Sequence, residues 1–488
     1  MAAQHNGMML RRPLIASAAA VTLLMTLTGP ALAQVSGGGA PIMPARPSPP
    51  ADVAAPTNIM PTTPAPATTA PTPSPTATPT PSSVSPPAAT PKEWSGQSGS
   101  SGHPEMTADA IRRAAANFPA CLARLWPEAA RRGVSREAYA QMTAGLTPDL
   151  RIMDLMDSQP EFTKAPWDYL DLLVTDARIA RGREMLAQYA QTFDAVEKAY
   201  GVDRYIIAAI WGVESNFGTM GGDRSVLRST ATLACIGRRQ AYFRDEFLAA
   251  VELLYRGDVR PDRLIGSWAG AFGPTQFMPT SFKRYAIDFD GDGRRDVVDS
   301  IPDLIASTAN NLKKDGWVPG QTWGYEVVLP QGFDFNLASK SRTMTTGQWA
   351  QLGVTRVGGK PFPRLNDPGY LLVPAGAGGP AFLMLKNFRV ILRYNPADAY
   401  ALAIGHLADR MKGFGPIVQA WPRHERVLSA TERYELQRHL ERHGFNVGKP
   451  DGMIGPRSRA AIKQYQASAG MVPDGFPTGS LLDRLRAR

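Results

Sequence analysis

Residues 205–218 read YIIAAIWGVESNFG and hold one carboxylate, Glu214. Apolar side chains fill nearly every position before it, which predicts a helix that is buried almost all round. Gly218 is the expected end of this helix, because glycine commonly closes helices. Burial and the negative end of the helix dipole both favour the protonated form of a carboxyl group here. Glu214 is therefore a candidate general acid, and the alternative is a structural ion pair with an arginine.

The histidine content of the large domain favours carboxylate chemistry. The chain has six histidines, but residues 106–420 hold only His406. Serine and cysteine nucleophiles usually need a histidine base, and zinc hydrolases usually need two or more histidine ligands. We therefore expect no protease, esterase or amidase in this domain. The only acidic residue close to Glu214 is Asp223, which we interpret as a turn residue in a glycine-rich loop.

Four motifs in residues 106–420 resemble those of lytic murein transglycosylases, and more specifically the membrane-bound lytic transglycosylase B type. They are ESNFG at 214–218, RRQAYF at 238–243, SWAGAFGPTQFMPTSF at 267–282 and YNPADAY at 394–400. The resemblance implies a lysozyme-like helical catalytic domain. The sequence departs from the family at Pro274-Thr275, where Tyr-Gly is common, and at Pro396-Ala397, where a polar pair is usual.

The resemblance also implies roles for individual residues. Glu214 is the implied sole acid/base, and Ser267 and Gln276 would hold the sugar and position the carboxyl group. The implied cleft residues are Tyr242, Tyr394, Asn395 and Tyr400. The implied reaction cuts the MurNAc–GlcNAc β-1,4 bond of peptidoglycan glycan strands and leaves a 1,6-anhydromuramyl end. The sugar's own acetamido group can stand in for a second carboxylate, so one glutamate can suffice.

The N-terminus predicts export. Arg11 and Arg12 precede an apolar run at 14–27, and Ala31-Leu32-Ala33 offers a cleavage site, so residues 1–33 are predicted to be a signal peptide. A membrane anchor is the alternative, but the run is short for a span. Residues 34–105 hold most of the excess proline and are predicted to be a disordered linker. We expect a periplasmic protein without a transmembrane anchor in the mature chain.

The remaining composition narrows the partners and the redox state. Cys121 and Cys235 are the only cysteines, and in an oxidising compartment we expect them to form a disulfide; two buried thiols are the alternative. The net charge of +10 suits an anionic cell wall or membrane surface, or serves only solubility. No nucleic-acid partner is expected for an exported protein.

Residues 288–299, DFDGDGRRDVVD, resemble an EF-hand loop, and B-type transglycosylases have a similar loop at the same place in the chain. Aspartates occupy positions 1, 3 and 5, and a glycine occupies position 6. We expect a structural Ca²⁺ site, and the alternative is an acidic turn without metal. The expected ligands are Asp288, Asp290, Asp292, the backbone carbonyl of Arg294, and Asp299 at position 12, where glutamate is usual.

The periodicity along the chain predicts an α+β, mainly α protein. Helical patterns run through 110–131, 178–200, 203–216, 239–256, 303–315 and 400–411, and β-rich segments occupy 325–329, 370–373 and 388–394. We expect a catalytic domain at 106–421 with a small β insertion. Residues 428–486 are expected to form a three-helix module that resembles a peptidoglycan-binding domain, on the evidence of LQ at 436–437, DGMIGP at 451–456 and DG at 474–475.

Two other functions remain open. One is a lysozyme-type hydrolase of the same bond, with Asp223 or a distant carboxylate as the partner of Glu214. The other is a non-catalytic wall-binding scaffold, which the intact acid and sugar-holding motif make less favoured.

Overall fold

The computed structural model describes residues 93–99, 102–156 and 164–487. The predicted signal peptide and nearly all of the predicted linker lie outside these residues. The linker's last part, however, already packs on the helical domain: the Ser95 backbone N–H and hydroxyl donate to the Asp154 carboxylate at 2.9 and 2.7 Å. The Arg112 guanidinium lies 5.5 Å from the ring centre of Trp94. The expected start of the folded chain at residue 106 was therefore too late.

The first group of helices has its own hydrophobic core, to which Phe118, Tyr139 and Phe247 contribute. The predicted helix at 110–131 is split at Asn117, because Pro119 fits only the first turn of a new helix. The helices of this group are α1 (Ala108–Ala116), α2 (Phe118–Arg131), α3 (Arg136–Thr143), α4 (Arg151–Met156), α10 (Val226–Cys235) and α11 (Gln240–Arg256).

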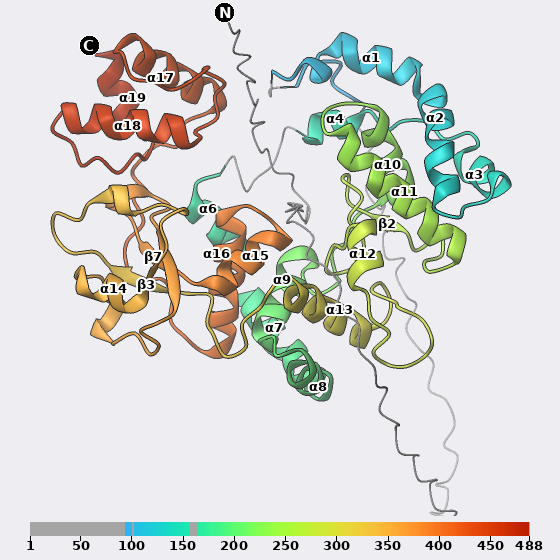
Figure 1. The fold of residues 1–488 in the computed structure, drawn as a ribbon, viewed down its shortest axis with the longest axis horizontal. Coiled ribbons are helices and arrows are strands. Elements are labelled where there is room, and N and C mark those ends of the chain that lie inside the picture. Colours follow the sequence, from blue (N-terminus) through green and yellow to red (C-terminus); the bar gives the residue numbers. More distant parts are fainter. Residues whose placement is uncertain (1–92, 100–101, 157–163, 488) are drawn as a thin grey trace, which may run out of the picture. The chain divides into compact units, whose positions relative to one another are not determined.

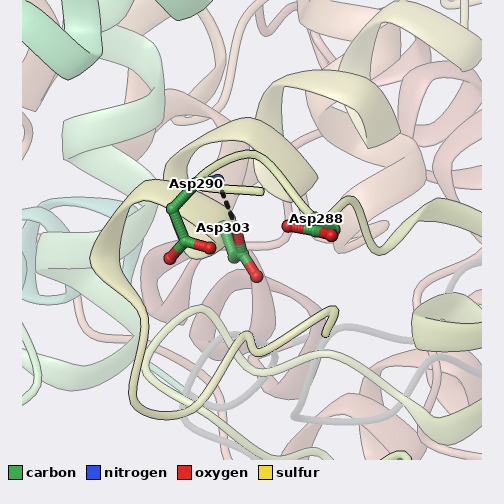
Figure 2. Close-up of side chains that lie close together, drawn as sticks. All are labelled: Asp288, Asp290 and Asp303. Carbon is green, nitrogen blue, oxygen red and sulfur yellow. Dashed lines mark hydrogen bonds between the residues drawn. The ribbon is translucent and has the colours of Figure 1, made fainter. Parts of the chain in front are cut away.

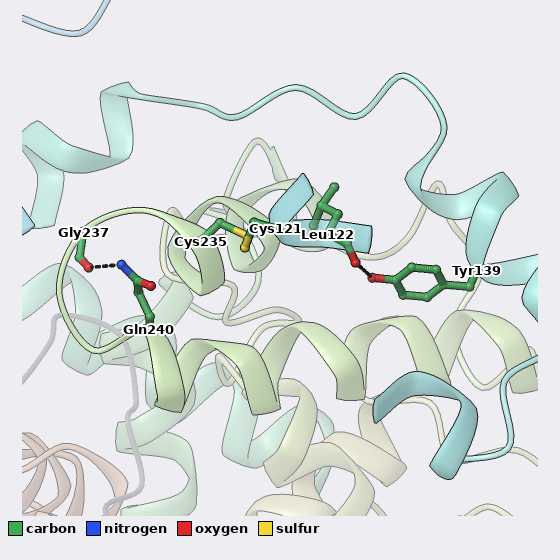
Figure 3. The surroundings of a disulfide bond; sticks show 6 residues. All are labelled: Cys121, Leu122, Tyr139, Cys235, Gly237 and Gln240. Atoms are coloured by element: carbon green, nitrogen blue, oxygen red, sulfur yellow. Dashed lines mark hydrogen bonds between the residues drawn. A yellow bond between two sulfur atoms is a disulfide. The ribbon is translucent and has the colours of Figure 1, made fainter. Parts of the chain in front are cut away.

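A disulfide joins Cys121 on α2 to Cys235 at the end of α10, as predicted (Figure 3). The turn that follows Cys235 leads into α11, where the Gln240 side-chain amide donates to the Gly237 carbonyl at 3.0 Å. On the other side of the bond, the Tyr139 hydroxyl donates to the Leu122 carbonyl at 2.7 Å. The bond thus connects the first helices to the turn that starts α11.

The helix predicted at 203–216 is α9 (Arg204–Ser215), and its residues 206–211 are at most 2% exposed. Helices surround it, which explains the nearly continuous apolar sequence. The predicted helix at 178–200 is two helices that meet at Tyr189. The helices that share the hydrophobic core of α9 are α6 (Pro166–Leu173), α7 (Asp176–Gln188), α8 (Ala190–Tyr200), α13 (Ile301–Lys314), α15 (Lys386–Tyr394) and α16 (Asp398–Lys412) (Figure 1).

A short antiparallel pair joins β1 (Arg224–Ser225), which precedes α10, to β2 (Ile265–Gly266), which follows α11. The chain then forms α12 (Pro279–Tyr285) before α13. The β insertion follows as a five-stranded antiparallel sheet in the order β4-β6-β7-β3-β5. Its strands are β3 (Gly324–Val328), β4 (Met344–Thr345), β5 (Thr355–Arg356), β6 (Pro368–Leu372) and β7 (Ala381–Met384), and α14 (Thr346–Gln351) lies between β4 and β5 in the chain.

The β insertion was predicted, but one of its strands was misplaced. The segment 388–394 is not a strand: it forms α15, and the third long strand is β7, which the sequence reading missed. Val390 and Ile391 have high β propensity, yet the buried positions of α15 at 387, 388, 390, 391 and 394 lie on one helical face. Tertiary burial of that face outweighed the local propensity.

The C-terminal module contains the three expected helices, α17 (Ala430–Arg442), α18 (Pro456–Ser468) and α19 (Gly479–Arg486). A capping box begins α17, because Ser429 and Glu432 bond each other's backbone N–H. The buried Gln437 amide oxygen accepts the Gly452 N–H at 2.7 Å and so ties the Asp-Gly turn to α17. Across the described ranges, every helix is too short or too polar to span a bilayer.

Replacing both Cys121 and Cys235 by alanine is expected to lower the free energy of unfolding by about 2–5 kcal/mol, because the bond closes a loop across 114 residues of sequence. Urea denaturation with and without dithiothreitol measures the effect. The reductant should destabilise the wild type and leave the double variant unchanged. A wild type that unfolds identically in both buffers would show that the bond contributes nothing.

Candidate active site

Glu214 lies in the last turn of α9 and is partly exposed, whereas its neighbour Ser215 is 2% exposed. The helix ends at Ser215, earlier than the stop predicted at Gly218, because Asn216 already has left-handed backbone (φ 49°). Phe217 (φ 60°) and Gly218 (φ 81°) continue in this conformation. Two consecutive non-glycine residues with positive φ are uncommon, and the surrounding structure must hold them.

Two contacts hold this turn. The Ser215 hydroxyl accepts the Gly218 N–H at 2.9 Å and donates to the main-chain carbonyl of Pro274 at 2.6 Å. The Phe217 ring packs on the helix itself, and a Cβ added at Gly212 would lie 2.6 Å from its Cζ atom. The end of the helix is thereby tied to the loop that contains Pro274.

Two buried tyrosines complete the surroundings of Glu214. The Tyr400 hydroxyl, at the start of α16, donates to Glu214 Oε1 at 2.6 Å. The Tyr394 hydroxyl, at the end of α15, donates to the main-chain carbonyl of Thr275. Burial, reinforced by the charge of Glu214, raises the pKa of both phenols well above the usual range. Both hydroxyls therefore stay protonated and act as donors.

The predicted sugar-holding residues lie on the loop between β2 and α12. The Ser267 hydroxyl accepts the Ala271 N–H at 3.1 Å. Gln276 has left-handed backbone (φ 53°) and is 8% exposed, and its side-chain amide donates to the Gly273 carbonyl at 3.0 Å. Both side chains therefore shape the loop.

The loop after α9 lies directly against the Ser267 loop. A Cβ added at Gly222 would lie 1.8 Å from the Gly266 carbonyl carbon, so only glycine permits this approach. The next residue, Asp223, has a side chain that is 94% exposed. It is a surface turn residue, as the sequence reading preferred, and not a buried partner for Glu214.

The structure places the other two predicted site residues in supporting positions. The Asn395 side-chain oxygen accepts the Ala397 N–H at 3.1 Å, in the turn that leads into α16. Tyr242, on α11, is partly exposed, and its hydroxyl bonds the buried carboxylate of Glu246. The sequence reading did not foresee Glu246. The hydroxyls of Tyr242, Tyr394 and Tyr400 all bond groups of the protein.

The acidic loop forms a carboxylate cluster whose members differ from the predicted set. Ligand-type oxygens of Asp288, Asp290 and Asp303 lie within 4.8 Å of one another (Figure 2). Asp303 is 0% exposed, and burial, with the charge of Asp290 added, raises its pKa. Asp299 points elsewhere, because Arg263 binds its carboxylate. Asp292 is outside the cluster and accepts the Arg294 N–H at 2.8 Å.

In the sequence, Asp303 was only the first residue of the helical pattern at 303–315 and was not among the expected ligands. In the structure Ser300 caps that helix, and the Asp303 carboxylate turns back to accept the N–H groups of Phe289, Asp290 and Asp296. A buried acid directly after an acidic loop was the signal that could have identified it.

The model of the family described as Transglycosylase SLT domain matches residues 117–409, which include α9, the Ser267 loop and both buried tyrosines. The chain belongs to this family. A second family model, that of a peptidoglycan binding domain, matches residues 429–485. The Escherichia coli K12 protein named Membrane-bound lytic murein transglycosylase B is 32% identical over 273 residues, which cover 53% of this chain and 73% of that protein.

Solved structures of similar proteins agree with the placement in the SLT transglycosylase family. SltB3 from Pseudomonas aeruginosa, in complex with NAG-anhNAM-pentapeptide, is 46% identical and superposes with a TM-score of 0.72. That match covers 76% of this chain and 99% of SltB3. The Escherichia coli lytic transglycosylase Slt35 in complex with calcium is 29% identical with a TM-score of 0.52, over 61% of this chain and 92% of Slt35.

The departures of this SLT transglycosylase from the family pattern leave the site's framework intact. Pro274 and Thr275 contact Ser215 and Tyr394 through main-chain carbonyls, which any residue supplies. The framework therefore does not depend on the side chains that differ.

Tyr400→Phe is expected to lower kcat by about 10- to 150-fold with little change in KM, because a hydrogen bond to a charged group contributes roughly 1.5–3 kcal/mol. Steady-state release of muropeptides from sacculi measures it. Tyr370→Phe is the matched control: Tyr370 is equally buried, and within the part of the chain that the structure describes its hydroxyl has no hydrogen-bond partner. Equal losses in both variants would contradict a specific role for Tyr400.

Proposed function

We propose that this protein is a lytic transglycosylase that cleaves the MurNAc–GlcNAc β-1,4 bond of peptidoglycan, with Glu214 as its acid/base. The observation that carries the proposal is the carboxyl group at the end of a buried helix. It is bonded by Tyr400, and Ser215 ties its helix to the loop of Ser267 and Gln276. Membership of the SLT transglycosylase family and the peptidoglycan-binding module support the same substrate.

The geometry suits a reaction with one carboxyl group. Protonated Glu214 gives its proton to the glycosidic oxygen as the C1–O bond breaks. The ionised Glu214 then takes a proton from the C6 hydroxyl, whose oxygen bonds C1 and closes the 1,6-anhydro ring. No water is consumed, and Glu214 ends in its starting state. The side chain of Asp223 is 94% exposed in a surface turn, which does not favour it as the second carboxylate of a two-carboxylate hydrolysis. The anhydro sugar in the SltB3 complex supports this product.

The Tyr400 hydroxyl has a defined task in this scheme. It donates a hydrogen bond to Oε1 of Glu214 in the structure. Such a donor stabilises the carboxylate that forms after Glu214 gives up its proton. It also helps to fix the direction in which the carboxyl group points.

Glu214→Gln is expected to abolish activity, because the amide can neither donate nor accept the transferred proton. Purified sacculi are digested with wild type and variant, and the released muropeptides are measured by mass spectrometry. Anhydromuropeptides should come from the wild type alone. Products of the wild type with reducing ends, one water heavier, would instead indicate a lysozyme-type hydrolase. A Glu214→Gln variant that keeps most of the activity would show that Glu214 is not the acid/base.

We also propose that the acidic loop holds a structural Ca²⁺ ion. The donor set fits, because Asp288, Asp290 and Asp303 offer hard carboxylate oxygens, and a buried acid among other acids favours a bound cation. The calcium complex of Slt35 supports the choice of metal. The ion would fix the loop against the start of α13, which packs on α9.

Calcium is expected to raise the melting temperature of the EDTA-treated protein, because a ligand that binds only the folded state stabilises it. Differential scanning fluorimetry across a CaCl₂ titration measures the shift. Asp288→Asn should abolish the shift, while Asp299→Asn, whose carboxylate pairs with Arg263, should keep it. If Asp299→Asn abolished the shift and Asp288→Asn kept it, Asp299 would be a calcium ligand, as the EF-hand pattern predicted.

Export to the periplasm completes the proposal. It rests on the sequence of residues 1–33 and on a substrate that lies outside the cytoplasm. The C-terminal module would hold the enzyme on the wall while the catalytic domain works, which raises the local substrate concentration.

A further inference from the structure

Glu246 is a buried acid that the proposed reaction does not use. It lies on α11, is 1% exposed, and burial raises its pKa. Its carboxylate accepts the Thr280 N–H at 3.0 Å and the Thr280 hydroxyl at 2.7 Å. It also bonds the hydroxyl of Tyr242. Burying a carboxylate carries a desolvation penalty, which the hydrogen bonds of its donors offset. Moving a donor away would leave the buried carboxylate unsatisfied, so the donors are held in place.

The first of these partners is the start of α12. The residue before that helix, Met278, provides no side-chain cap. Glu246 supplies the missing acceptor from α11, which packs against α12 (Figure 1). A carboxylate near the first turn also matches the positive end of the helix dipole.

The start of α12 is where the substrate-holding loop ends. Only three residues separate Gln276, with its left-handed backbone, from Thr280. Between them, Phe277 pairs with Phe272 through two backbone hydrogen bonds of 2.9 Å. Fixing Thr280 therefore fixes the direction in which the chain leaves Gln276, at the end of the loop whose carbonyls contact Ser215 and Tyr394.

The second partner is the ring of Tyr242. The Arg239 guanidinium lies 4.6 Å from its ring centre, and the Phe243 ring packs edge-on at 5.0 Å. With its hydroxyl bound to Glu246, the ring has no free rotation, yet the residue remains partly exposed. One carboxylate thus contacts both a partly exposed tyrosine and the end of the loop of Gln276.

We propose that Glu246 is a positioning residue: it holds Tyr242 and the Gln276 end of the loop in one arrangement that fits the glycan strand. This inference rests on the proposed function. It predicts that loss of the carboxylate weakens substrate binding, because Glu246 no longer holds Tyr242 and the Gln276 end of the loop in fixed positions. Glu214 and Tyr400 should stay in place.

The chain offers a matched control on the same helix. Glu252 is also on α11, is 3% exposed, and contacts α12 through Lys283 and its own helix through Arg256. It joins the same two helices as Glu246 but away from the start of α12. Glu252→Gln therefore measures the effect of losing a buried carboxylate between α11 and α12 without disturbing the loop.

The test compares Glu246→Gln with Glu252→Gln by steady-state kinetics on soluble glycan chains and by thermal unfolding. We expect both to lose thermal stability, but only Glu246→Gln to raise KM, by about tenfold, with kcat within about twofold of wild type. Tyr242→Phe should raise KM by a smaller factor, and the double variant Tyr242→Phe/Glu246→Gln should be no worse than Glu246→Gln alone.

Other results decide against the proposal. An active wild type with parallel kinetic losses in the two glutamine variants overturns the positioning role and leaves the enzyme function standing. A wild type that releases no anhydromuropeptides overturns both. Should Glu246→Gln fail to fold, Thr280→Val, which loses only the hydroxyl donor, is compared with Thr280→Ser, which keeps it. A raised KM in the valine variant alone supports the proposal, and equal KM values refute it.

Discussion

The hydrogen bond from the Ser215 hydroxyl to the Pro274 carbonyl joins the end of the buried helix to the loop that follows β2. The helix cannot continue past Ser215, because the next three residues all have left-handed backbone. This turn directs the chain back against Gly266, next to Ser267. The carboxyl group of Glu214 and the predicted sugar-holding loop share one neighbourhood because of that contact.

Much of the site is built from polar groups that bond main-chain atoms. Tyr394 bonds the Thr275 carbonyl, Gln276 bonds the Gly273 carbonyl, and Asn395 bonds the Ala397 N–H. Such groups specify shape without demanding particular side chains from their partners. This explains how the loop keeps its arrangement although Pro274 and Thr275 depart from the pattern usual in the family.

Three acids show how environment divides tasks among carboxylates. Glu214 is partly exposed at a helix end and meets a tyrosine donor, which suits proton transfer. Glu246 is fully enclosed and bonded by Thr280 and Tyr242, which suits holding a loop. Asp303 is enclosed beside two other aspartates, which suits a cation. Burial raises the pKa of both Glu246 and Asp303, but their partners differ and so do the roles we infer.

The sequence alone determined the buried helix, the position of Glu214 at its end, the family motifs, the three-helix module and the disulfide between two cysteines. These follow from local periodicity, from composition and from motifs read along the chain. Tertiary structure decided what depends on contacts between distant segments. It made 388–394 a helix rather than a strand, because that segment buries a helical face. It replaced Asp299 by Asp303 in the acidic cluster, because Arg263 lies beside Asp299. It also brought Glu246 to Thr280, a pairing that sequence spacing does not encode, since the two residues lie on different helices that meet only when the chain is folded.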